Sequence, residues 1–131
     1  MNDLTARQGD NPRAYGMKLL FIIALPFKLI SKSNHKGTGR YLPAKYRVFE
    51  ESIAYCAIAA CKKPMLKEAW CVIRPHFQNK IHPDLSNLEK SLLDGLVKGG
   101  VFSDDKYIAC TVVPAIYGDE CSEVEIWGMP K

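Results

Sequence analysis

The sequence lacks a hydrophobic run long enough to cross a membrane. Its longest apolar run, LLFIIALPF (Leu19–Phe27), has nine residues, whereas a membrane-spanning helix needs about 20. The run also lacks the small-residue cleavage site that follows a signal peptide. These absences favour a cytoplasmic protein that does not enter the membrane.

The cysteines lack the spacing of a metal or redox site. There are five of them, no two show C-x-x-C spacing, and no histidine lies close enough to complete a zinc pattern. Each lies in an apolar stretch, so we expect reduced thiols in the core of a cytosolic protein. The residues are Cys56, Cys61, Cys71, Cys110 and Cys121.

Acidic residues are missing from one long segment near the N-terminus. Between Met17 and Phe49 there are seven basic residues and no acidic one, while the whole chain has a formal net charge of +4. The rest of the chain is therefore acidic, which indicates a polyanion-binding surface beside a carboxylate site. A surface that only confers solubility explains the same excess. The basic residues are Lys18, Lys28, Lys32, Lys36, Arg40, Lys45 and Arg47.

The hydrophobic pattern predicts one small domain of the α/β class, in the mixed α+β sense. Residues 1–16 are polar and without period, so we expect a flexible leader, followed by a domain over residues 17–131. The elements follow the order β-α-β-α-β-β, which implies a mixed sheet of about four strands with two helices on one face. The strands are expected at 18–26, 68–77, 107–116 and 121–127, and the helices at 44–62 and 87–98.

Acidic residues flank the second predicted helix. Asp84 precedes it, and Ser86 is followed three residues later by Glu89, which is the spacing of a capping box. Capping and the helix dipole explain these residues without any function. At the other end, Asp104 and Asp105 follow a glycine turn and lie too far beyond the helix to cap it.

These acidic residues are candidate metal ligands. If the second and third strands are neighbours, Asp105 can fold back beside Asp84, and converging carboxylates suit a hard divalent ion. Asn87, Lys90 and Asp94 form a polar stripe on the helix, from which Lys90 can reach a phosphate. Lys90 and Asp94 can equally form an ordinary exposed ion pair. A metal ion, a lysine and a basic segment together suggest phosphodiester hydrolysis.

Two stretches resemble the RusA-type Holliday junction resolvases. PDLSNLEKSLLDGLVKGGVFSDDKYI resembles the family signature, which has an Asp-x-Asp-Asn-Leu-x-Lys run, a helix, and then glycine and Asp-Asp before a strand. LPFKLISKSNHKGTGRYLPAKYRVFEESI resembles the opening strand, the basic Ser-Lys-x-Asn loop and the first helix of the family. The resemblance implies a homodimeric endonuclease that depends on Mg²⁺, with Mn²⁺ as an alternative ion, and nicks four-way DNA junctions symmetrically.

The resemblance also implies roles for individual residues. The first metal-ligand aspartate of the family corresponds to Asp84, the catalytic lysine to Lys90, and the aspartate after the glycine turn to Asp105, with Asp104 beside it. The basic loop and the start of the first helix are expected to contact DNA. The residues expected there are Lys32, Asn34, Lys36, Arg40, Lys45 and Arg47.

One position departs from the family pattern. The second aspartate of the signature is Ser86 in this chain, which removes one anionic ligand. Either water fills the place, or Asp94 or Asp104 supplies the missing oxygen. This departure leaves open a non-catalytic nucleic-acid-binding relative with an impaired metal site. A further alternative is a structural or interaction protein in which all these acidic residues are caps and surface charges.

Overall fold

A mixed four-stranded sheet forms the centre of the computed structural model, which describes residues 12–30, 44–61, 66–104, 106 and 108–128. The strand order is β1-β6-β2-β4, with β6 antiparallel to both its neighbours and β2 parallel to β4. This arrangement confirms the predicted mixed sheet and the adjacency of the second and third predicted strands. The strands are β1 (Lys18–Leu25), β2 (Ala69–Arg74), β4 (Ile108–Val112) and β6 (Ser122–Gly128).

Prolines interrupt two of the predicted strands. Pro75 separates β2 from the two-residue β3 (His76–Phe77), because proline has no backbone N–H to continue the ladder. The strand predicted to reach Ile116 ends at Val112, and the short β5 (Ile116–Tyr117) follows Pro114. β3 and β5 pair in parallel as a separate small sheet. Predicting two longer strands here was therefore wrong in detail.

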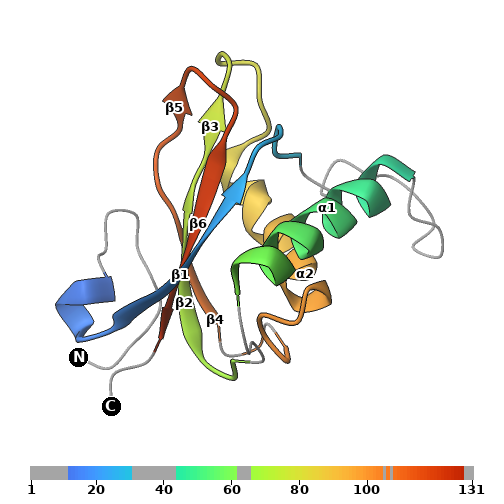
Figure 1. The fold of residues 1–131 in the computed structure, drawn as a ribbon. Coiled ribbons are helices and arrows are strands. Elements are labelled where there is room, and N and C mark those ends of the chain that lie inside the picture. The colour runs from blue at the N-terminus through green and yellow to red at the C-terminus, as the bar shows by residue number, and fades with distance from the viewer. Residues whose placement is uncertain (1–11, 31–43, 62–65, 105, 107, 129–131) are drawn as a thin grey trace.

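Both helices cover one face of the sheet (Figure 1). They are α1 (Ala44–Ala60) and α2 (Leu88–Lys98), which pack against each other over the side chains of Ile23, Cys71, Ile73, Val124 and Ile126. Gly95 allows a close approach of the two helices, because a Cβ atom at this position would lie 2.7 Å from Ile53 Cβ. The structure confirms the predicted placement of two helices on one face.

The opposite face of the sheet carries a smaller aromatic cluster. Its buried members are Met17, Trp70, Val72 and Trp127. The 3₁₀ helix η1 (Pro12–Tyr15) lies against this cluster, with the Tyr15 ring centroid 5.3 Å from that of Trp70 and the Arg13 guanidinium 5.3 Å from that of Trp127. The packed part of the chain thus begins before residue 17, whereas residues 1–11 lie outside the described residues.

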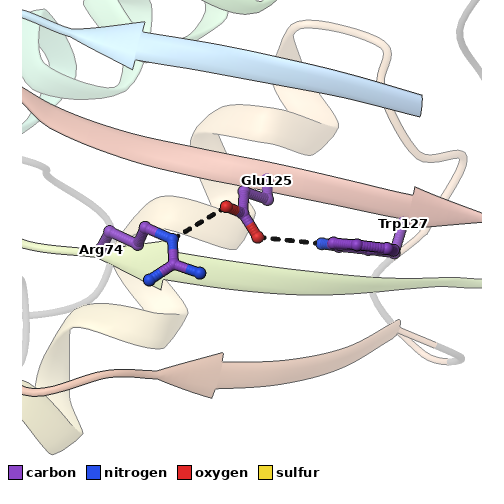
Figure 2. A network of polar contacts seen from close by, with 3 residues as sticks. All are labelled: Arg74, Glu125 and Trp127. Atoms are coloured by element: carbon purple, nitrogen blue, oxygen red, sulfur yellow. Dashed lines mark hydrogen bonds and ion pairs between the residues drawn. The ribbon is translucent and has the colours of Figure 1, made fainter. Parts of the chain in front are cut away.

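A polar network borders the aromatic cluster (Figure 2). Arg74 Nε donates a hydrogen bond to Glu125 Oε2 at 2.8 Å, and Trp127 Nε1 donates to Glu125 Oε1 at 3.0 Å. Glu125 and Trp127 lie on the same face because they are two residues apart on β6. Glu125 therefore joins the central strand β2 to β6 and holds the Trp127 ring in place.

The cysteines are free thiols with different environments. Cys61 and Cys71 are buried, and Cys56 and Cys110 are partly buried. Cys121 is exposed, so the prediction of a core position was wrong for this residue, which lies in the segment that leads into β6. Among the described residues, no helix has both the length and the apolar character needed to span a membrane.

Candidate nuclease site

Asp84 lies at the start of the helical segment that leads into α2. It is the N-cap residue of the 3₁₀ helix η3 (Leu85–Asn87), and its backbone oxygen accepts a hydrogen bond from Asn87 N at 3.0 Å. Its exposed side chain makes no capping hydrogen bond. Side-chain capping therefore does not account for this carboxylate, which lies open to solvent and to a ligand.

The predicted capping box between Ser86 and Glu89 does not form. α2 begins at Leu88, and the side chain of its N-cap residue, Asn87, makes no capping hydrogen bond. Glu89 instead lies near the Cys110 thiol of β4, and burial, together with the negative charge of this carboxylate, raises the pKa of that thiol. The first turn of α2 thus lies near β4, and Ser86 is exposed.

Lys90 and Asp94 form an ion pair on α2. Lys90 Nζ lies 3.1 Å from Asp94 Oδ1, and the lysine side chain is 73% exposed, whereas that of the aspartate is 24% exposed. Asp94 follows Asn87 by seven residues, which corresponds to about 10 Å along a helix. Ligands of one ion lie about 2 Å from it. Within one chain, this spacing separates Asp94 from the Asp84 end of the helix.

Asp104 lies beyond the C-terminal end of α2, in the connection from β2 to β4. Phe102 bridges Leu66, which precedes β2, and Asp104 then leads toward the start of β4. Asp84, in contrast, follows the segment that leaves the far end of β2 through β3. Because β2 and β4 are parallel, α2 must run back between these two places, and its 11 residues span about 16 Å.

Strand adjacency therefore does not bring Asp84 and Asp104 together in one chain. Asp105 lies outside the described residues, so its expected approach to Asp84 stays a prediction. In the ranges that the structure describes, no three His, Cys, Asp or Glu side chains are grouped so that they could hold a metal ion.

Basic residues border a pocket close to Asp84 in sequence. Lys45 and Arg47 are exposed on the first turn of α1. Lys32, Asn34, Lys36 and Arg40 lie outside the described residues. A pocket of about 410 Å³ opens beside Lys45, lined by Lys28, Ile30, Lys45, Tyr46, Ile81, His82 and Pro83. Sequence analysis missed this pocket because its walls come from three segments that are far apart in the chain.

The part of the chain that matches a known protein family includes both Asp84 and Asp104. No curated protein matches the chain. Residues 28–127 match the sequence profile of the family described as Endodeoxyribonuclease RusA, which is about three quarters of the 131-residue chain. The chain therefore belongs to the RusA family of endodeoxyribonucleases, and this membership implies endonuclease activity at Holliday junctions.

Proposed function

We propose that this protein is a Mg²⁺-dependent endonuclease that nicks four-way DNA junctions as a homodimer, with each active site built from two chains. The observation that carries this proposal is the parallel crossover from β2 to β4, which puts Asp84 and Asp104 at opposite ends of α2. A two-fold axis can place the Asp84 end of one chain beside the Asp104 end of the other. The same operation creates a second, identical site.

The donor chemistry suits Mg²⁺, which prefers carboxylate oxygens and retains several waters. Asp84 of one protomer, and Asp104 with Asp105 of the other, would hold the ion, while Ser86 and Asn87 would offer only neutral oxygens. A bound Mg²⁺ supplies an activated water and neutralises negative charge on the reacting phosphate. Lys90 orients a phosphate oxygen through its ammonium group, and Asp94 holds that ammonium at 3.1 Å.

A two-fold dimer also matches the substrate. A four-way junction presents two equivalent strands for cleavage, so an enzyme with two equivalent sites can nick both. Exposed apolar side chains on one side of α1 offer surface for such an association: Val48 is 59% exposed, Tyr55 80% and Ile58 63%. Monomeric proteins rarely leave extended apolar patches uncovered, which favours burial of this helix face between two protomers.

The DNA backbone would follow the basic surface at the start of α1. Lys45 and Arg47 are exposed there, and the predicted loop residues Lys32, Lys36 and Arg40 directly precede this helix. Contacts of lysine and arginine with phosphates position DNA without reading its sequence. Replacement of Lys45 and Arg47 by alanine is expected to weaken junction binding and to flatten its salt dependence.

Subunit complementation tests the shared site. Asp84→Asn and the double variant Asp104→Asn/Asp105→Asn should each fail to nick a synthetic four-way junction. When the two variants are co-expressed at equal levels and pair at random, half of the dimers are heterodimers. Each heterodimer has one site with all its aspartates and one site with none. The mixture should therefore regain about one quarter of the wild-type rate of nicking.

The controls separate this arrangement from a site within one chain. Doubling the concentration of either variant alone should not restore nicking of the junction. If each site lies within one chain, every site in a heterodimer lacks one ligand set, and the mixture stays inactive. If the wild-type protein with Mg²⁺ does not nick the junction in preference to a linear duplex of the same sequence, the proposed activity itself fails.

A non-catalytic relative is the second candidate function. Ser86 occupies a place where the family signature has an aspartate, and its side chain is exposed beside Asp84. In that case the protein should bind junctions through its basic surface without cleaving them. Mg²⁺ should then leave the thermal melting unchanged, because only a ligand of the native state raises its apparent stability.

A further inference from the structure

The pocket beside Lys45 offers a binding site that the nuclease activity does not account for. We propose that it receives one unstacked nucleotide of the junction, next to the strand that is cut; this inference rests on the proposed function. Three segments form the pocket: the stretch after β1, the start of α1, and residues 81–83. Its volume of about 410 Å³ suits a small organic ligand better than a bare ion.

The charges around the pocket select an anion. Lys28 and Lys45 are two of its seven lining residues, and none of the seven is acidic. Lys28 Nζ donates a hydrogen bond to the backbone oxygen of Ile81 at 3.3 Å, which holds its ammonium at the pocket wall. Lys45 Nζ lies 5.0 Å from the ring centroid of Tyr46. Two ammonium groups on one pocket favour a phosphate-bearing ligand.

The remaining walls suit a flat, partly apolar group. Ile30, Ile81 and Pro83 provide apolar surface, and Ile81 is 79% exposed, although isoleucine usually avoids solvent. Tyr46 and His82 add aromatic rings. A nucleobase has polar edges and two flat faces that stack on such side chains. Phosphate and base together define a nucleotide as the ligand class.

The His82 ring is held rigidly at this wall. It stacks on Phe77, with ring centroids 4.3 Å apart and an interplanar angle of 9°. Its Nδ1 lies 2.8 Å from the backbone oxygen of Pro83, and its Nε2 lies 3.0 Å from Tyr117 Oη. The carbonyl can only accept, so Nδ1 donates and, in the neutral ring, Nε2 accepts from the tyrosine. A wall fixed in this way loses little conformational entropy when a ligand binds.

A four-way junction can supply an unstacked nucleotide at low cost. Extracting a base from a continuous duplex breaks both its pairing and its stacking, and the cost is smallest where stacking is already interrupted. Stacking is interrupted where strands cross between the arms of a junction. Pro83 directly precedes Asp84, and consecutive Cα atoms are about 3.8 Å apart. A nucleotide in the pocket would thus lie close to a proposed metal ligand and help to distinguish junctions from linear DNA.

The test is a thermodynamic cycle between the pocket and single bases of the DNA. Binding of the full-length protein is measured in Ca²⁺ to a set of four-way junctions, each lacking one base near the crossover. At one position, loss of the base should weaken wild-type binding about five- to tenfold. In Ile81→Ala the same loss should weaken binding less than twofold. The matched variant Ile22→Ala, 51% exposed on β1, should retain the full wild-type dependence.

A matched pair of lysine variants tests the proposed phosphate contact. Lys28→Met and Lys18→Met each remove one charge from an exposed lysine, at the pocket and at the far end of β1 respectively. Lys28→Met should reduce the slope of log affinity against log salt concentration by about one unit. Lys18→Met should leave the slope unchanged.

The outcomes separate the pocket from the nuclease. If the junction is bound and nicked but no missing base matters more than twofold, the nucleotide pocket is refuted and the nuclease stands. A base dependence that persists in Ile81→Ala places the unstacked base elsewhere and equally refutes the pocket. If Lys28→Met flattens the salt dependence without any base effect, the pocket binds backbone phosphate only, which also overturns the inference. A protein that neither binds nor nicks junctions overturns both proposals.

Discussion

Substitution of Gly95 by alanine tests how tightly the two helices are packed. On helix propensity alone, alanine should stabilise α2 by about 1 kcal/mol. The added methyl group, however, would lie 2.7 Å from Ile53 Cβ and 2.8 Å from Ile53 Cγ2. These atoms belong to a branched, fully buried side chain and cannot rotate away. Overpacking of this kind costs about 1–3 kcal/mol, so we expect a net loss of about 1 kcal/mol.

Urea unfolding of four proteins measures this balance: the wild type, Gly95→Ala, Ile53→Ala and the double variant. Ile53→Ala alone should lose about 2–5 kcal/mol through the cavity that it creates. In that background α1 can shift into the space, so adding Gly95→Ala should cost much less or even stabilise. The coupling free energy should be about 1 kcal/mol. If Gly95→Ala stabilises the wild type, or if the coupling is zero, the helices are not in contact at this residue.

Three further predictions address the site, the sheet and the thiols. Ser86→Asp adds a carboxylate near Asp84 and should enlarge the rise in Tm caused by Mg²⁺; an unchanged rise would show that the missing ligand comes from elsewhere. Thr111→Val removes the partner of the buried Trp70 Nε1, which donates at 2.8 Å, and should cost about 1–3 kcal/mol in urea unfolding; a loss below about 0.5 kcal/mol would contradict this. Iodoacetamide at pH 8 should modify the exposed Cys121 well before Cys61, because burial raises the pKa of the Cys61 thiol to about 11; mass spectrometry showing equal rates would refute this order.

The main elements could be predicted because their periods are unambiguous. Alternation along β6 places Val124 and Ile126 in the main core and Glu125 on the other face. Helical spacing likewise places Phe49, Ile53 and Ala57 on the buried side of α1. These patterns can be read from the sequence because buried positions are occupied by apolar residues at the spacing of a strand or a helix.

Details that depend on competing contacts were harder to predict. Ser86 and Glu89 have the spacing of a capping box, yet no such box forms, and the Glu89 carboxylate lies near the Cys110 thiol, which is 21 residues further along the chain. Pro75 follows the last residue of β2 and ends that strand. The chain leaves the sheet there although β2 itself is a central strand between β6 and β4, and the length of a central strand depends on partners that are distant in the sequence.

The candidate site could be predicted as a set of residues but not as an arrangement. The order of Asp84, Lys90 and Asp104 along the chain indicates the family and the chemistry. The direction in which β4 pairs with β2 decides whether the acidic residues before and after α2 lie close together. Local sequence does not encode that direction. The pocket was missed for a similar reason, since Lys28, Tyr46 and Ile81 become neighbours only after folding.

The aromatic cluster on the helix-free face gives this protein a built-in optical reporter. The chain has only two tryptophans, Trp70 and Trp127, and both belong to that cluster, under Arg13 and Tyr15. Intrinsic tryptophan emission therefore arises entirely from one side of the sheet, away from α1 and α2. A ligand that changes this emission without unfolding the protein must alter the surroundings of these two rings, either directly or through the strands. Emission can thus distinguish events on the two faces without any added label.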